Sequence, residues 1–131
     1  MPVDAALNRL SSVVIGAAIE VHKQLGPGFP ESIYECALET ELKLRGIVCS
    51  RQVPVHILYK GQAVGEGRLD LLIENSLIVE LKAVDELSKL HEAQLISYLK
   101  ATAHPLGLLI NFKVTLLRDG VKRIVYGNEP P

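Results

Sequence analysis

The sequence feature that most constrains the fold is a pair of neighbouring apolar runs that both carry charged residues. The runs are "RLDLLI", residues 68–73, and "SLIVELKA", residues 76–83, and two residues separate them. Side chains alternate between the two faces of a strand, so Asp70 interrupts the first run, while Glu80 and Lys82 share one face of the second. We therefore predict two strands of a hairpin whose charged residues serve a purpose other than packing.

The turn between the two runs sets the register of this hairpin. If it closes symmetrically around Asn75, Asp70 lies directly opposite Glu80, because each is five residues from the turn centre. Directly opposed residues of an antiparallel pair share a face, with Cβ atoms about 4.5–5.5 Å apart. Lys82 follows on the same face of its strand, roughly 7 Å further along. The sequence thus predicts two carboxylates and an ammonium group on one patch of the sheet.

Two carboxylates at this distance repel each other, and one pKa rises strongly, unless a proton or a cation lies between them. A divalent cation is the simpler partner, because Mg²⁺ is commonly held by one or two carboxylates with water and phosphate oxygens. Beside such a site, Lys82 could orient a nucleophilic water and neutralise charge that develops on a phosphoryl group. The alternative is an ordinary ion pair of Lys82 with Asp70 or Glu80 at a solvated sheet edge, and spacing alone leaves both interpretations open.

Periodicity elsewhere in the chain predicts three helices. Apolar residues from Leu7 to Leu25 recur at three- and four-residue spacing, as in an amphipathic helix that is ended by "GPGFP". A second helix is predicted over residues 31–46, with Gly46 as its C-terminal cap, and a third over residues 87–102. The residues expected to face the core are Ile33, Ala37, Leu38 and Leu42 of the second helix and Leu87, Leu90, Leu95 and Leu99 of the third.

The other apolar runs predict further strands. Residues 53–59 and 64–73, with "KGQ" between them, join 76–83 as three antiparallel strands. "LGLLINF", residues 106–112, is too continuously apolar for an edge strand and is typical of a strand covered on both faces. Residues 114–126 are predicted as a C-terminal β-hairpin that turns at Asp119-Gly120. The expected fold class is α/β.

Composition narrows the classes of function. The chain has 131 residues, 48% hydrophobic and 22% charged, which is typical of one domain over 1–131 with a tail at 127–131. A formal net charge of -1 excludes a global basic field, so nucleic-acid binding would need a local patch. The only two cysteines predict reduced thiols, and no apolar run approaches the ~20 residues of a membrane span. We expect a cytoplasmic protein without membrane contact.

These residues resemble a known family. Asp70, then nine residues, then Glu80-Leu81-Lys82 is similar to the site of the PD-(D/E)XK nuclease superfamily, and "GFPESIY", residues 28–34, resembles the signature of its GxxExxY family. The blocks that are similar to that family in order are "EVHKQLGPGFPESIYE", "YKGQAVGEGRLDLLIE", "IVELKA", "HEAQLISYLKAT", "LGLLINF" and "DGVKRIV". One departure is Leu69, which stands before Asp70 where the superfamily's name has proline.

The resemblance implies a fold and a chemistry. The fold would be a restriction-endonuclease-like αβββαβ core, with a central mixed sheet flanked by helices. Asp70, Glu80 and the backbone carbonyl of Leu81 would hold Mg²⁺ or Mn²⁺ for hydrolysis of phosphodiester bonds. Lys82 would assist the attacking water. The implied partner is nucleic acid, with DNA favoured over RNA.

Two further pairs of residues are auxiliary or substrate-binding candidates by the same resemblance. Gln94 and Tyr98 lie four residues apart on one predicted helix face and resemble a Q-x-x-x-Y motif that contributes to the site or to DNA contact. Glu31 and Glu35 begin the second predicted helix, where several superfamily branches place a glutamate near the metal. Each pair also has a plain interpretation, as a helix surface pair and as acids that favour the positive end of a helix dipole.

Three functions stay open at this point. The leading hypothesis is a metal-dependent nuclease. The second is a non-catalytic module that keeps the fold and binds nucleic acid or protein, although the intact Asp70, Glu80 and Lys82 count against it. The third is hydrolysis of a smaller phosphate ester by the same metal chemistry. A homodimer that widens the binding face is a further hypothesis.

Overall fold

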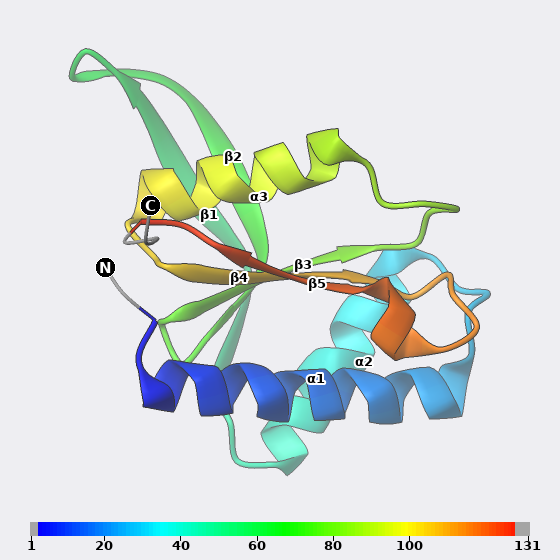
Figure 1. Cartoon of the computed structure of the whole chain (residues 1–131). Helices are drawn as coiled ribbons and strands as arrows, with labels where there is room; N and C mark the ends of the chain where they lie inside the picture. Colours follow the sequence, from blue (N-terminus) through cyan, green and yellow to red (C-terminus); the bar gives the residue numbers. More distant parts are fainter. Residues whose placement is uncertain (1–2, 128–131) are drawn as a thin grey trace.

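The computed structural model describes residues 3–127 (Figure 1). Its elements are α1 (Ala5–Leu25), α2 (Glu31–Leu44), β1 (Cys49–Tyr59), β2 (Gln62–Ile73), β3 (Leu77–Lys82), α3 (Lys89–Thr102), β4 (Leu106–Asn111), the 3-10 helix η1 (Leu117–Gly120) and β5 (Val121–Val125). Most of the predicted tail, residues 128–131, lies outside the described residues.

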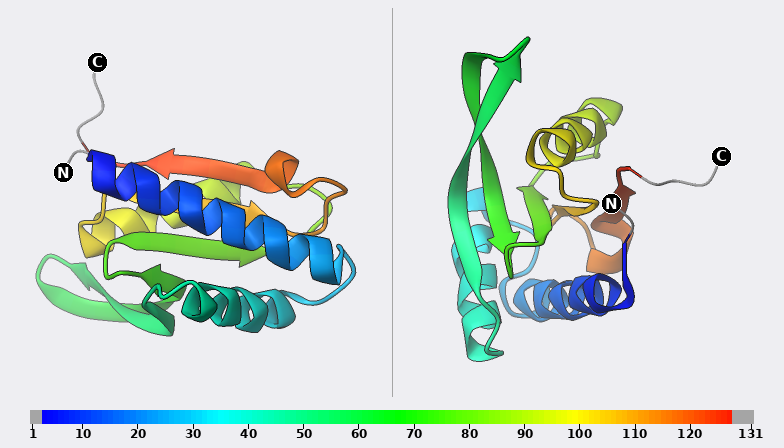
Figure 2. Two further views of the ribbon diagram at one scale, coloured as in Figure 1. Left: turned by 90° about the horizontal axis from the view of Figure 1, so that it is seen from below. Right: turned by 90° about the vertical axis from the view of Figure 1, so that its left-hand side faces the viewer.

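The strands form a mixed sheet in the order β1-β2-β3-β4-β5. β3 and β4 run parallel, and α3 supplies the crossover that a parallel pair requires, while the other neighbouring strands are antiparallel. α1 and α2 cover one face of the sheet and α3 covers the other (Figures 1 and 2). The predicted class, an α/β protein with helices flanking a central mixed sheet, is confirmed, as are the three antiparallel strands β1 to β3.

Strand β4 contributes side chains to the core layers on both faces of the sheet. All six of its residues are buried, as its unbroken apolar sequence predicts. Leu106, Leu108 and Ile110 pack toward α1 and α2, whereas Leu109 packs toward α3 with Leu95. A strand covered on both faces has no need of polar side chains, which explains why its sequence does not alternate.

The helix ends follow local chemistry. The Asp4 side chain accepts a hydrogen bond from Leu7 N at 2.8 Å, and α1 ends at Gly26, whose φ of 73° suits glycine. α3 begins with a capping box, in which Ser88 Oγ accepts from His91 N and His91 Nδ1 accepts from Ser88 N. These caps place the helix boundaries within a few residues of those predicted.

Two residues that were expected in the core are exposed. Ile33 is 43% exposed and Leu90 is 77% exposed, so these two predictions are wrong. Each lies five residues before a buried leucine, Leu38 or Leu95, which is roughly 140° around the helix at about 100° per residue. The faces that contact the sheet are therefore narrower than the apolar pattern suggested.

Of the C-terminal β-hairpin predicted over residues 114–126, only the second strand forms, so the prediction of a hairpin there is wrong. Residues 117–120 form η1 instead of the tip of a two-residue turn, and β5 pairs with β4 from Leu106↔Val125 to Ile110↔Val121. A Cβ on Gly120 would lie 2.2 Å from the Asn111 carbonyl oxygen, so η1 packs closely on the end of β4. β5 thus covers the edge of β4 that faces away from β3.

Candidate active site

The carboxylates of Asp70 and Glu80 lie where β2 and β3 separate. Paired residues run from Ile73↔Leu77 to Leu71↔Val79, a register centred on Asn75 as predicted. Beyond the last pair, Asp70 N donates to Glu80 Oε2 at 2.9 Å, and Leu81 N donates to Asp70 Oδ2 at 2.8 Å. The two carboxylates thus take the place of backbone acceptors at a fork between the strands.

The neighbouring β1 is also irregular at this level. Its pairs with β2 pass from Arg51↔Leu71 to Val53↔Leu69, so Gln52 and Asp70 face each other without being paired. Leu69 packs in the core layer beneath α3, whereas Leu71 packs in the layer beneath α1 and α2. The alternation of faces along β2 is therefore interrupted at Asp70, at the level of the fork.

The environment of the two acids disfavours negative charge. Glu80 is 5% exposed, and burial, followed by the charge of Asp70, raises its pKa to about 8. Burial also raises the pKa of Asp70, while the hydrogen bond from Leu81 N and the charge of Lys82 act in the opposite direction. Backbone N–H groups engage one oxygen of each acid, so Asp70 Oδ1 and Glu80 Oε1 remain for another ligand.

Lys82 follows Glu80 on β3 and is partly exposed. Among the ion pairs of residues 3–127, none joins Lys82 to Asp70 or Glu80 within 4.0 Å. Its charge nevertheless lowers the pKa of both acids. The structure thus favours a nearby, unengaged ammonium group over the ordinary ion pair that spacing had left open.

The predicted acids of α2 differ in their surroundings. Glu31 is exposed in the first turn of α2, and its charge raises the pKa of Asp70. Glu35 is buried and accepts hydrogen bonds from Arg51 and Gln52 of β1. Its charge raises the pKa of both Asp70 and Glu80, so Glu35 belongs electrostatically to the same site.

The two members of the predicted Q-x-x-x-Y pair lie on α3 but differ in their surroundings. Tyr98 is half-buried against β2, where a Cβ on Gly67 would lie 2.6 Å from its ring. That contact is three residues before Asp70. Gln94 is exposed, and none of the hydrogen bonds within residues 3–127 involves its side chain.

Tyr34, the last residue of the GxxExxY-like segment, has a positioning role in this fold. Its hydroxyl donates to Gly26 O and accepts from Phe29 N, and its ring stacks on Phe112 at 4.3 Å between centroids. These contacts fix the loop that leads into α2 and hence the position of Glu31. The spacing of the motif could not show that its tyrosine points into the core.

Asn111, at the end of β4, was missed by sequence reasoning. It is 2% exposed, its Nδ2 donates to Val84 O, and its Oδ1 accepts from Val84 N and Lys113 N. These bonds hold the segment that follows Lys82. The sequence feature that could have indicated it is an amide side chain inside the apolar run "LGLLINF", because a buried amide needs hydrogen-bond partners.

The donor set at the fork suits a hard divalent cation. Across the described ranges, no three or more acidic, histidine or cysteine side chains are grouped to hold a metal ion. At the fork, Asp70 and Glu80 would be the side-chain ligands of such a cation, and water or a substrate oxygen would complete the shell. Mg²⁺ is commonly bound in this way, because it retains several waters.

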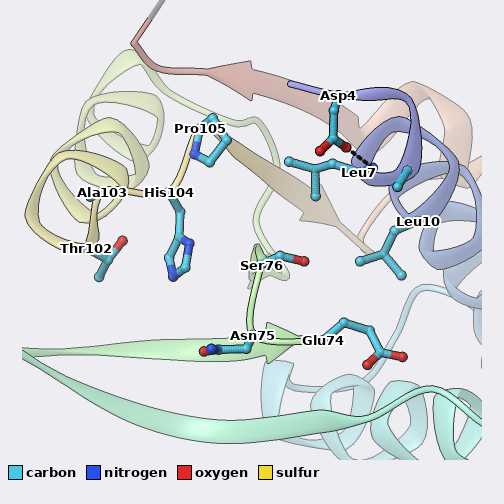
Figure 3. A pocket seen from close by; sticks show the side chains of 11 residues that line it. Asp4, Leu7, Leu10, Glu74, Asn75, Ser76, Thr102, Ala103, His104 and Pro105 are labelled. Carbon is cyan, nitrogen blue, oxygen red and sulfur yellow. Dashed lines mark hydrogen bonds between the residues drawn. The ribbon is translucent and has the colours of Figure 1, made fainter. Parts of the chain in front are cut away.

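A pocket of about 890 Å³ lies away from this fork. Its lining comes from the start of α1, the turn between β2 and β3, and the connection from α3 to β4 (Figure 3). The turn precedes β3, whereas the fork lies toward the opposite end of that strand. The acidic fork and this pocket are thus separate features.

The mixed sheet, its flanking helices and the acidic fork define a restriction-endonuclease-like α/β protein. A family model described as the PD-(D/E)XK nuclease superfamily matches residues 8–124. The chain belongs to the PD-(D/E)XK nuclease superfamily.

Further comparisons give the fold alone. The crystal structure of SSO0001 is similar, with 23% sequence identity and a TM-score of 0.55, over 75% of this chain and 50% of that one. This chain thus spans half the length of that protein. No curated protein matches the sequence. Within residues 3–127, no helix is long and apolar enough to cross a membrane.

Proposed function

We propose that this protein is a divalent-metal-dependent nuclease whose site is the fork between β2 and β3. The observation that carries the proposal is the pair of a buried Glu80 and a half-buried Asp70, which lie beside each other with raised pKa values and one uncommitted oxygen each. A cation between them would offset the repulsion that the fold imposes. The superfamily match supports phosphodiester hydrolysis as the reaction.

Each residue of the fork has a role in this proposal. Asp70 Oδ1 and Glu80 Oε1, together with the backbone carbonyl of Leu81, would hold Mg²⁺ or Mn²⁺. The bound ion would polarise the phosphate and lower the pKa of a water molecule. Lys82 Nζ would orient the attacking water and offset charge on the phosphate oxygens.

The auxiliary residues have less direct roles. Glu31 and Glu35 add negative charge near the fork, and Tyr98 braces β2 beside Asp70. Gln94, exposed on the same helix as Tyr98, would contact the substrate. DNA is the favoured substrate, and the segment at residues 28–34 supports membership of the GxxExxY family.

The proposal extends to the organisation of the protein. We picture one nuclease-like domain over the chain, acting in the cytoplasm without membrane contact. A homodimer would widen the nucleic-acid-binding face. A chain with a formal net charge of -1 has no excess of Lys and Arg to bind phosphates, so a wider face would increase its affinity. Light scattering at working concentration tests this point, and a mass equal to one chain would remove the dimer.

The test of function is cleavage of single-stranded, duplex, nicked and branched DNA and RNA with Mg²⁺ or Mn²⁺. We compare the parent protein with Asp70→Asn and Lys82→Ala, and use Lys100→Ala, an exposed lysine in the last turn of α3, as the matched control. The proposal expects metal-dependent cutting that both site variants lose and the control retains.

Other outcomes separate the remaining functions. Equal cutting by the parent and Asp70→Asn would place the activity in a contaminant. Metal-independent binding without turnover would favour a non-catalytic module. Cleavage of small phosphate esters that oligonucleotides do not inhibit would favour the third hypothesis.

A further inference from the structure

The cavity of about 890 Å³ has no part in the proposed nuclease site. It lies between the start of α1, the turn that joins β2 to β3, and the connection from α3 to β4 (Figure 3). Pockets that hold small molecules usually measure about 300–1,000 Å³ and combine an apolar lining with a few polar groups. The volume of this cavity therefore suits a small organic molecule.

One wall of the cavity is apolar. Leu7 and Leu10 of α1 supply it, and Pro105 continues it from the other side of the cavity. Figure 3 shows both leucine side chains directed from α1 into the space that the turn and the α3–β4 connection enclose. Such a wall favours a ligand with an apolar body, because burying apolar surface against it is favourable.

His104 lies on the opposite side of the cavity, with its ring directed toward the β2–β3 turn (Figure 3). It is half-buried, and burial lowers its pKa below the ordinary value, so the imidazole is neutral near neutral pH. Within residues 3–127, His22 and His91 use a ring nitrogen in a hydrogen bond, whereas His104 does not. A neutral imidazole offers one acceptor nitrogen to a ligand that carries an N–H donor.

Both charged residues of the lining are acids, Asp4 and Glu74, and no lysine or arginine of residues 3–127 lines the cavity. Neither acid forms an ion pair in this part of the chain. Asp4 Oδ1 accepts from Leu7 N, which leaves its Oδ2, and Glu74 Oε1 accepts only a long hydrogen bond of 3.4 Å from Val48 N. The carboxylates therefore have acceptor positions for a donor on a ligand.

The helix ends around the cavity add to this charge. The last residue of α3, Thr102, and the residue after it, Ala103, line the cavity, and the C-terminal end of a helix carries partial negative charge. Lys100, the base in the last turn of α3, does not line the cavity. The positive end of α1 is capped by Asp4. An anionic ligand is thus disfavoured here and a cationic one is favoured.

Strained backbone also gathers around the cavity. Five non-glycine residues within 3–127 have positive φ, and three of them line it: Glu74 at 51°, Asn75 at 52° and Ala103 at 57°. Glycine is the usual residue just after a helix and in a two-residue hairpin turn, because it adopts these angles without strain. Strain of this kind clusters at ligand sites, where the surrounding structure maintains it.

We propose that this cavity binds a small organic amine, with its apolar body against the leucines of α1 and its ammonium group toward Asp4 and Glu74. His104 offers the ammonium group a further acceptor. The site is separate from the fork and goes beyond the proposed nuclease function, so its test requires no cleavage.

The test follows the backbone amide signals of the intact protein by NMR during titration with phenethylamine, which is protonated near neutral pH. Phenethyl alcohol and hydrocinnamate serve as neutral and anionic comparators with the same aromatic body. The amides of Leu7, Ser76 and Ala103 report on the cavity, because these residues come from its three sides. We expect saturable shifts at these amides with the amine, weaker binding of the alcohol, and none of the carboxylate.

Two substitutions remove charge from the cavity and keep its shape. Asp4→Asn retains a side-chain oxygen that can accept from Leu7 N, so α1 stays capped, and Glu74→Gln is nearly isosteric. Ala6→Trp fills the cavity from an exposed position in its lining, and Ala93→Trp, at an exposed alanine of α3 outside the lining, is its matched control. Circular dichroism verifies that each variant is folded.

We expect Asp4→Asn and Glu74→Gln each to weaken phenethylamine binding by about 3-fold, and the double variant by about 10-fold, as solvent-accessible charge pairs do. Binding of phenethyl alcohol should not change in these variants. Ala6→Trp should remove binding of the amine, and Ala93→Trp should retain it. This set of results would support a cavity that selects a positive charge.

Three results would each overturn the proposal: no saturable shifts with phenethylamine, equal affinity for the amine and the alcohol, or unchanged amine affinity in the folded double variant. An Asp70→Asn arm separates the cavity from the fork, whose carboxylates also attract cations. Retained amine binding in Asp70→Asn is expected. Loss of binding there would place the amine at the fork and reject the cavity, without any bearing on nuclease activity.

Discussion

The Asp70 N–H donates to the Glu80 carboxylate at 2.9 Å, and the Asp70 carboxylate in turn accepts from the residue after Glu80 at 2.8 Å. Each acid is therefore tied to the opposite strand of the fork. The two carboxylates cannot relieve their repulsion by moving apart without breaking these bonds. The fold itself therefore holds two carboxyl groups together, where a proton or a cation is needed between them.

Divalent metal should stabilise the folded protein through this pair. At 100 times Kd, Mn²⁺ or Mg²⁺ should raise the free energy of unfolding by about 2.7 kcal/mol and Tm by roughly 10 °C. Differential scanning fluorimetry measures the shift. Asp70→Asn should abolish it, while Asp85→Asn, an exposed acid after β3, should retain it. An equal shift in Asp70→Asn would place the metal elsewhere.

The metal-free protein should lose stability as the pH rises. The pKa of Glu80 is raised from 4.5 to about 8, so between these values the folded state holds a proton that the unfolded state has released. The free energy of unfolding should fall across this window, on the order of 5 kcal/mol, and level off above it. Urea unfolding in a metal chelator between pH 4 and pH 9 tests this, where Glu80→Gln should flatten the profile. A parent profile that rises over this range would contradict the buried, protonated Glu80.

Tyr34→Phe should destabilise the loop before α2 rather than act on chemistry directly. The change leaves Gly26 O and Phe29 N without their shared hydroxyl partner, at a cost of about 1–3 kcal/mol. Urea unfolding gives the cost, and hydrogen exchange at the Phe29 amide localises it. Tyr59→Phe is the control, since Tyr59 is 62% exposed. Equal stability of the two variants would show that the hydroxyl of Tyr34 contributes nothing.

Gly67→Ala should be destabilising because Tyr98 occupies the space of the added methyl group. The new Cβ would lie 2.6 Å from the ring, and overpacking of this kind costs about 1–3 kcal/mol. Gly65→Ala is a matched control on the same strand, with nothing within 4 Å of its Cβ. In a Tyr98→Ala background the penalty of Gly67→Ala should largely vanish in urea unfolding. A penalty that persists there would assign it to the backbone and not to Tyr98.

Local pattern was sufficient for much of the fold. The register around Asn75, the end of α1 at Gly26 and the two-sided burial of β4 all follow from strand period, turn position and glycine conformation. Each of these depends on residues that are close in sequence. Most of the helices and strands could therefore be predicted, and Asp70 and Glu80 could be singled out as neighbours, while the mixed sheet flanked by helices was implied by the family resemblance.

The predictions that were wrong concern contacts between segments that lie far apart in the sequence. The helical period determines on which face of a helix an apolar residue lies. Only the tertiary packing decides whether that face contacts the sheet, as the exposed Ile33 and Leu90 show. Similarly, β5 pairs with β4, a partner ten residues or more away that the turn residues near Asp119 do not indicate.

The sequence by itself determined the hairpin, the pair of acids and the lysine that follows them. Only the tertiary structure decided that β2 and β3 separate at Asp70, that burial raises the pKa of Glu80 to about 8, and that Glu35 is held nearby by β1. The physical reason is that period and turn chemistry act over a few residues. Burial, charge coupling and strand divergence depend on segments brought together across the whole fold.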